Sequence, residues 1–211
     1  MEYRVSVSCH QGLVRENMED YAYPECGFSG ILKPTVSVAV LDGLGGHPGG
    51  EVASETAAQF VKEVVDEETF KDAMKRASLA VAEAFHGSAT TITLGILMDD
   101  GIDVYWIGDS PAFAIYKDGS CRMITTPHAE PKTGRITSVL GGRKPGEFFY
   151  DHVFVPASDV KAVILASDGL TAHLNEEEIA DIYLSGGDLI KEVLDRGAVD
   201  NVTVAVIEPV E

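Results

Sequence analysis

Acidic residues next to glycines recur along the chain, each beside an apolar run. An aspartate just past a buried strand lies at the strand end, and an adjacent glycine lets the backbone approach a ligand. Several such carboxylates at one place repel one another unless a cation neutralises them. Oxygen ligands without a matching Cys or His pattern indicate Mg²⁺ or Mn²⁺. The segments are Met18-Glu19-Asp20, Asp42-Gly43, Gly108-Asp109-Ser110, Ser167-Asp168-Gly169 and Asp200-Asn201.

A simpler interpretation exists for two of these segments. Taken alone, Asp42-Gly43 and Asp168-Gly169 also fit tight turns, because Asp-Gly is a frequent turn dipeptide. Lys117-Asp118-Gly119 is predicted to be only such a turn. Asp42-Gly43 follows the apolar run 38–41, and Asp168-Gly169 follows the apolar run 163–166. Both carboxylates could therefore project from the same edge of a sandwich.

Composition limits the classes of protein and partner. A chain of 211 residues with 45% hydrophobic content fits one globular domain. The net charge of -18 argues against nucleic acid and anionic membranes as partners, since both require a basic surface. No apolar stretch is long enough to span a bilayer, and the N-terminus does not resemble a signal peptide. Cys9, Cys26 and Cys121 lack metal-site spacing and are odd in number, so they are predicted to be reduced thiols in a cytoplasmic protein.

The apolar pattern predicts the elements that must position the carboxylates. Hairpins in the middle of the chain favour antiparallel sheets over a regular parallel series. The predicted class is therefore α+β, a four-layer α-β-β-α sandwich of two mainly antiparallel sheets with helix pairs outside. We expect one domain over 1–211. Strands are expected at 3–9, 36–41, 90–98, 102–107, 112–116, 121–125, 160–166 and 202–207, and helices from Pro48 to about Val64, over 70–85, after Asn175 and over 189–194.

The acidic segments, taken in order, resemble the metal-dependent protein serine/threonine phosphatases of type 2C, in a short, bacterial-like form related to the stage II sporulation phosphatases. Each motif alone is weak, but their joint order over nearly the whole chain is specific. Gly12, Arg15 and Asn17 match residues of the opening G-x-x-R-x-x-N pattern, with one residue instead of two between the arginine and the asparagine, and Met18 precedes the acidic pair. The matching segments are Gly12 to Asp20, Asp42 to His47, Gly50 to Ser54, Thr90-Thr91, Trp106 to Ser110, Leu165 to Leu170 and Asp200 to Val204.

The resemblance implies a role for each site residue. Two Mn²⁺ or Mg²⁺ ions would activate a water that attacks phosphorus, so no protein nucleophile is required. Arg15 would grip the phosphate with its planar guanidinium, although a surface salt bridge is the simpler alternative. Asp109 would bind a third ion, with a polar strand-end turn as its alternative. The implied metal residues are Asp42, Gly43 through its carbonyl, Asp168, Asp200, Asp20 through a water, and Glu19 behind them.

The sequence also departs from the family pattern. Leu44 replaces a histidine proposed as general acid in animal members, and the proton donor is unassigned, with His47 as one candidate. Pro111 stands where the family usually has arginine, and His128 is predicted to lie in a surface loop. The segment 126–142 is short and predicts a reduced flap, which would leave the site open with little peptide-sequence preference.

Two functions of different classes follow. The first is hydrolysis of phosphoserine and phosphothreonine in proteins, with a kinase target or an anti-anti-sigma factor as substrate. The alternative is a non-catalytic module that contains metal and binds a phosphoprotein or another partner.

Overall fold

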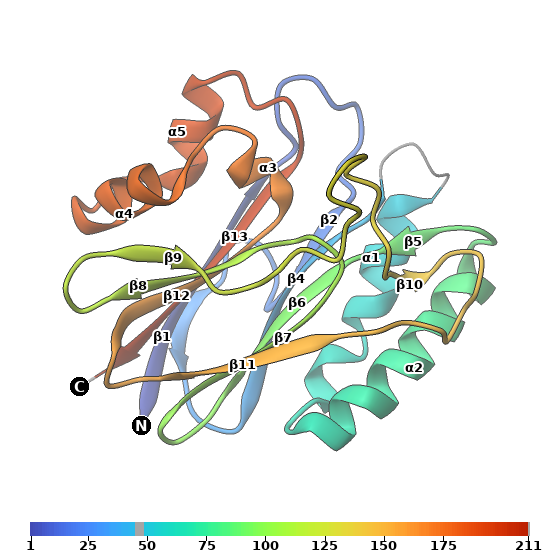
Figure 1. Ribbon diagram of the computed structural model, residues 1–211, viewed down its shortest axis with the longest axis horizontal. Coiled ribbons are helices and arrows are strands. Elements are labelled where there is room, and N and C mark those ends of the chain that lie inside the picture. The colour runs from blue at the N-terminus through green and yellow to red at the C-terminus, as the bar shows by residue number, and fades with distance from the viewer. Residues whose placement is uncertain (45–48, 211) are drawn as a thin grey trace.

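The computed structural model describes residues 1–44 and 49–210, and its centre is two sheets packed face to face (Figure 1). Neighbouring strands in each sheet are antiparallel, and the two ends of the chain lie side by side because Glu2 pairs with Val210. The six-stranded sheet has the order β3 (Ser29–Leu32), β1 (Glu2–His10), β13 (Val202–Val210), β12 (Val160–Ala166), β8 (Ala112–Tyr116) and β9 (Cys121–Met123).

A five-stranded sheet forms the second inner layer. Its order is β11 (Asp151–Pro156), β7 (Gly101–Ile107), β6 (Ile92–Leu97), β4 (Val36–Asp42) and β2 (Asp20–Tyr23). A separate pair of short strands, β5 (Ala89–Thr90) and β10 (Leu140–Gly141), lies next to the end of β4, since Thr90 forms an isolated bridge with Gly43.

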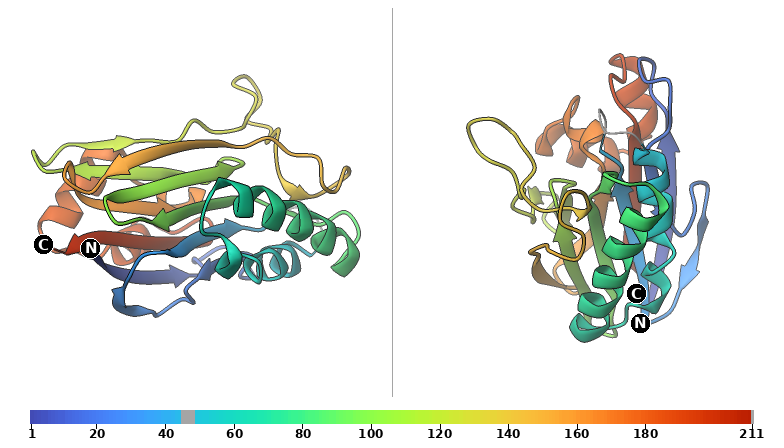
Figure 2. Two further views of the ribbon diagram at one scale, coloured as in Figure 1. Left: turned by 90° about the horizontal axis from the view of Figure 1, so that it is seen from below. Right: turned by 90° about the vertical axis from the view of Figure 1, so that its right-hand side faces the viewer.

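Helices cover the outer face of each sheet (Figures 1 and 2). The five-stranded sheet packs on α1 (Gly50–Ala58), the short 3-10 helix η1 (Val61–Glu63) and α2 (Glu67–Ala84). The six-stranded sheet packs on α3 (Asp168–Thr171), α4 (Glu176–Leu184) and α5 (Leu189–Asp195). A third apolar cluster fills the space between the sheets. The predicted four-layer α-β-β-α sandwich is confirmed.

Local chemistry explains where the longer helices begin. The side chain of Asp66 accepts a hydrogen bond from the Thr69 backbone, and Thr69 reciprocates, so α2 starts with a capping box. Asn175 and Glu178 form the same reciprocal pair at the start of α4, where the sequence predicts a helix. The apolar residues of α2 then recur on one face and are buried against the sheet.

Several expectations require correction. The sequence pattern missed β2, β3, β10, β11 and the short helix α3. The helix expected from Pro48 to Val64 ends at Ala58, and Pro48 itself lies outside the described residues. The turn at Lys117-Asp118-Gly119 is confirmed, since Gly119 N donates to Tyr116 O over 3.0 Å.

The cysteine prediction is wrong for two of the three residues. Cys9, at the end of β1, forms a disulfide with Cys26, seventeen positions later, while Cys121 is a free thiol. Sequence spacing did not indicate the pair, because the two residues meet only where the chain returns beside β1 after β2, with hydrogen bonds from Gly27 N to Val7 O and from Val7 N to Phe28 O. Among the described helices, none is long and apolar enough to cross a membrane.

Candidate functional site

Four of the predicted aspartates lie at strand ends along one edge of the sandwich. Asp42 ends β4, and its cross-strand partner Asp20 begins β2. In the other sheet β12 ends just before Asp168 and its antiparallel neighbour β13 begins just after Asp200. Each of these four carboxylates affects the pKa of at least one of the other three. The structure thus brings together the carboxylates that the sequence placed at strand ends.

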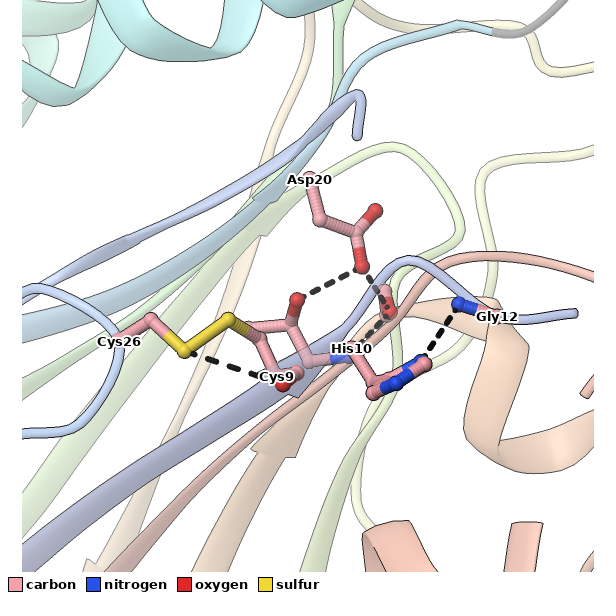
Figure 3. The surroundings of a disulfide bond; sticks show 7 residues. Cys9, His10, Gly12, Asp20 and Cys26 are labelled. Carbon is pink, nitrogen blue, oxygen red and sulfur yellow. Dashed lines mark hydrogen bonds between the residues drawn. A yellow bond between two sulfur atoms is a disulfide. The ribbon is translucent and has the colours of Figure 1, made fainter. Parts of the chain in front are cut away.

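Asp20 is the most buried of the four, with 5% of its surface exposed. Its Oδ2 accepts hydrogen bonds from Ser167 Oγ at 2.7 Å and Thr203 Oγ1 at 2.8 Å. Figure 3 draws these two bonds as the dashed lines that meet at Asp20. Its Oδ1 is buried without a hydrogen-bond partner among the described residues. Burial raises the pKa of Asp20 to about 7, and the charges of Asp168 and Asp200 act in the same direction. An unpaired buried carboxylate oxygen is costly and indicates a missing cation or water.

Asp42 and Asp168 lie close to each other. Burial raises the pKa of Asp42 well above its usual range, and the charges of Asp20 and Asp168 raise it further. Desolvation raises the pKa of Asp168 and the charge of Asp200 adds to this, while a hydrogen bond with Asp42 opposes both. Like charges at this separation share protons unless a cation replaces them.

Gly43 allows β4 to end against α1. A Cβ at this position would lie 2.1 Å from Gly50 O and 2.8 Å from Glu19 O, so no side chain fits. Its backbone N donates to Glu19 O at 3.0 Å. The Glu19 carboxylate lies against the first turn of α1, since a Cβ at Gly50 would lie 2.8 Å from its Oε1. Burial and the charge of Glu51 raise the pKa of Glu19.

Arg15 lies on the loop between β1 and β2 and contacts the acidic cluster. Its Nη2 donates to Asp200 Oδ2 at 2.8 Å, and 42% of its side-chain surface is exposed. The hydrogen bond and the charge of Asp200 raise the pKa of Arg15. The guanidinium therefore neutralises part of the cluster and still faces solvent on one side.

Asn201 holds that loop in place, a role that the sequence analysis did not assign. Its Nδ2 donates to Gln11 O at 2.7 Å and to Asn17 O at 2.9 Å, and its Oδ1 accepts from Glu19 N at 2.8 Å. The three bonds span the segment that carries Arg15 and fix both of its ends. The available signal was the Asp-Asn pair before the last strand.

Asp109 follows β7 and lies at the same edge, partly buried. Burial raises the pKa of Asp109 to about 6, and the charge of Asp168 contributes. The preceding residue, Gly108, forms two hydrogen bonds with His128. Gly108 N donates to His128 Nδ1 at 3.1 Å, and His128 N donates to Gly108 O at 2.9 Å.

His128 is therefore buried, and the prediction of a surface loop is wrong. Only 5% of its surface is exposed, and its ring packs on Trp106 and Phe149. Because Nδ1 accepts from Gly108, the proton lies on Nε2, which is 3.0 Å from Asp151 Oδ2. His128 thus anchors the turn that positions Asp109. His47 lies outside the described residues.

The donor set fits divalent cations. Within the described ranges, no three acidic, His or Cys side chains are close enough to hold one ion as they stand. Asp200 is paired with Arg15, and Asp20 accepts hydrogen bonds from two hydroxyls. All available donors are nevertheless oxygens, the cluster is acidic, and one buried oxygen lacks a donor. These properties match Mn²⁺ or Mg²⁺.

Comparison with known proteins agrees with this geometry. Residues 28–196, well over half of the chain, match the family model described as Protein phosphatase 2C. The chain is 26% identical to the serine/threonine protein phosphatase PstP of Mycobacterium tuberculosis (strain CDC 1551 / Oshkosh) over 99% of its own length and 45% of that protein. It is also 26% identical to a putative protein phosphatase 2C-type of Streptococcus pyogenes serotype M6, covering 97% of this chain and 96% of that protein.

A solved structure shares the fold. The catalytic domain of the serine/threonine protein phosphatase PstP, in complex with two manganese ions, superposes with a TM-score of 0.79. The two chains are 27% identical, and the match covers 100% of this chain and 99% of that chain. The chain spans about half the length of the full PstP protein that it matches. On its family match, its two-sheet fold and its carboxylate cluster, this chain belongs to the protein phosphatase 2C family.

Proposed function

We propose that this chain hydrolyses phosphoserine and phosphothreonine monoesters in proteins, with two Mn²⁺ or Mg²⁺ ions and a third near Asp109. The observation that carries the proposal is the acidic cluster, in which Asp20 Oδ1 is buried without a donor and Arg15 lies at the rim. Such a cluster is costly without cations, and an exposed guanidinium beside it can bind a dianionic substrate.

Each residue has a task in this proposal. Asp42, the Gly43 carbonyl, Asp168 and Asp200 would hold the ions, and Asp20 would accept a hydrogen bond from a water among them. When bound, the two ions would supply a water of lowered pKa and positive charge to offset charge on the phosphoryl oxygens. Glu19 would lie behind these ligands and keep the α1 end of the cluster acidic.

Arg15 would orient the phosphate. Its five donors form a planar fork that can bind two phosphoryl oxygens together, and its half-exposed side chain can turn from Asp200 toward a substrate. The three hydrogen bonds of Asn201 restrict the loop, so less freedom is lost when substrate is bound. Arg15 thereby stabilises charge that develops on the phosphoryl group.

The substrates would be phosphorylated proteins, either targets of a serine/threonine kinase or an anti-anti-sigma factor. The named relatives are protein phosphatases, which supports this substrate class. A cytoplasmic location stays a prediction. The disulfide between Cys9 and Cys26 does not favour it, because disulfides are rare in reducing compartments.

One observation favours the alternative, a non-catalytic module that binds a phosphoprotein. Arg15 is paired with Asp200, and among the described residues no three ligands converge on one ion. A chain that kept this pairing in solution would lose Asp200 as an ion ligand.

Phosphate release separates the two functions. The substrates are a small aryl phosphate and a phosphothreonine peptide, each with Mn²⁺, Mg²⁺ or chelator, and Asp42→Asn serves as the inactive control. We expect turnover that requires metal and is lost in the variant. Absence of turnover on both substrates at saturating Mn²⁺, combined with measurable phosphopeptide binding, would contradict hydrolysis and support the binding module.

A further inference from the structure

A basic cleft lies next to the candidate site. Its volume is about 1010 Å³, and its walls come from three parts of the chain. One wall is formed by His86 and Gly87, in the connection after α2, and by Ala89 at the start of β5. The second is the segment 135–149, and the third is Leu44, directly after Gly43. Leu44 N donates a hydrogen bond to Ala89 O at 2.9 Å, so the wall that contains Ala89 is held next to the end of β4, which carries Asp42.

The charge of this cleft is opposite to that of the chain. Arg135, Arg143 and Lys144 line it, and the single carboxylate among its lining residues, Glu147, is 3.4 Å from Lys144 Nζ. In the described part of the chain, neither Arg135 nor Arg143 forms a side-chain hydrogen bond or ion pair. Two unpaired guanidinium groups on a chain of net charge -18 are available to an acidic ligand.

The frame of the cleft is fixed by buried contacts. Ser78 Oγ, on α2, accepts hydrogen bonds from Gly141 N at 2.9 Å and Gly146 N at 2.8 Å. Gly141 has a φ of 79°, and a Cβ there would lie 2.4 Å from a methyl group of Val81. Ser138 Oγ exchanges hydrogen bonds with the backbone of Phe149. The segment therefore forms a preorganised wall, which lowers the entropic cost of binding.

We propose that this cleft binds acidic residues that flank the phosphorylated residue of a protein substrate. The inference rests on the proposed function and adds a substrate class to it. Phe149 and Val139 also line the cleft, so an extended segment with an apolar side chain among its acidic residues fits the lining. Such a segment advances about 3.4 Å per residue, so it reaches the cleft within a few residues of the phosphate. The proposal replaces the weak sequence preference expected from the short segment 126–142.

Charge reversal tests the proposal. Arg135→Glu and Arg143→Glu are made singly and together, with Arg122→Glu as a matched control. Arg122 is exposed on β9 and does not line the cleft. Three substrates are compared: a phosphothreonine peptide with acidic flanks, the same peptide with glutamine in place of the acids, and a small aryl phosphate. Arg135→Ala with Arg143→Ala gives a milder version, and fluorescence of the single tryptophan, Trp106, reports folding.

The wild type should prefer the acidic peptide by about tenfold in kcat/KM, and added salt should reduce that preference. The double reversal should remove the preference and leave aryl phosphate turnover unchanged, while the control retains both. Equal use of the two peptides by the wild type would overturn the proposal, as would a double variant that keeps the preference.

Failure of the proposed function has a different signature, because aryl phosphate turnover would then be absent as well. In that case fluorescence anisotropy measures peptide binding to the wild type and to the double variant. This measurement tests whether the cleft binds acidic residues. Tighter binding of the acidic peptide that depends on both arginines supports the proposal, and equal binding overturns it.

Discussion

Asp20→Asn should stabilise the metal-free protein at alkaline pH. Burial raises the pKa of Asp20 from 3.8 to about 7, so the folded state disfavours its ionised form. Because a shift of one pH unit corresponds to about 1.4 kcal/mol, the ionised carboxylate costs up to about 4 kcal/mol. Burial raises the pKa values of Asp42 and Asp168 as well, so part of the penalty belongs to them and we assign about 2 to 4 kcal/mol to Asp20 itself.

The asparagine keeps most local contacts. Its carbonyl oxygen can accept from Ser167 and Thr203, as the carboxylate does. Loss of two charge-assisted bonds costs about 1 kcal/mol. The net gain in the free energy of unfolding is therefore about 1 to 3 kcal/mol near pH 8.5.

The sign of the pH dependence follows from the same shift. The folded pKa of Asp20 lies above the unfolded one, so the folded state binds more protons between about pH 4 and pH 7. The wild type without metal should lose stability as pH rises through this window, and the advantage of the asparagine should be about 1 to 2 kcal/mol smaller near pH 5.5. Added Mn²⁺ should reverse the order, because the wild type gains ligand binding energy that the variant loses.

Urea unfolding, followed by Trp106 fluorescence in chelator, measures both effects. Asp99→Asn is the control for net charge, since its side chain is 90% exposed. Equal unfolding free energies for Asp20→Asn and wild type at pH 8.5 would refute the electrostatic reasoning. Wild-type stability that rises with pH over the window would do the same.

Three further outcomes are expected. Arg15→Lys should lower kcat more than tenfold, since lysine keeps the charge but not the planar fork. Calorimetry should find the metal affinity little changed. Collapse of metal affinity with kcat retained would mean that Arg15 organises the cluster. Asn201→Ala should reduce the free energy of unfolding by about 2 to 3 kcal/mol, because three hydrogen bonds to the Arg15 loop are lost, and urea unfolding checks this. Cys26→Ser should reduce the free energy of unfolding by about 3 kcal/mol, because the unfolded chain is no longer closed into a loop by the disulfide. The shift in urea midpoint measures this loss, and reducing agent on the wild type should reproduce it.

The layered fold could be predicted because its strong elements are periodic. The alternation of β1 and the apolar run of β12 are typical of strands, and the pattern of α2 indicates a helix. The missed elements lack such a signal. β2 begins at Asp20 and is four residues long, so its pattern is dominated by a site residue. β11 carries exposed residues at alternate and adjacent positions because it is an edge strand.

The site could be predicted in its residue types but not in its contacts. Acidic residues at the ends of apolar runs are visible in the sequence, and four of them do converge. The disulfide, the clamp by Asn201 and the burial of His128 each join segments that are adjacent only after folding. Residue spacing carries no information on such pairs, since their distance is set by the order of strands in the sheets.

Arg15 shows how this difference bears on function. The resemblance to type 2C phosphatases implies that the Arg15 guanidinium binds the phosphate, whereas in the structure it is paired with Asp200 at 2.8 Å. Both contacts follow from one property, a half-exposed cation beside an acidic cluster, and the cluster's charge decides between them. Cations bound at Asp42 and Asp168 would lower the negative potential that holds Arg15 on Asp200. The guanidinium would then be freer to contact a phosphate, so ion loading and substrate binding are coupled through the single carboxylate of Asp200.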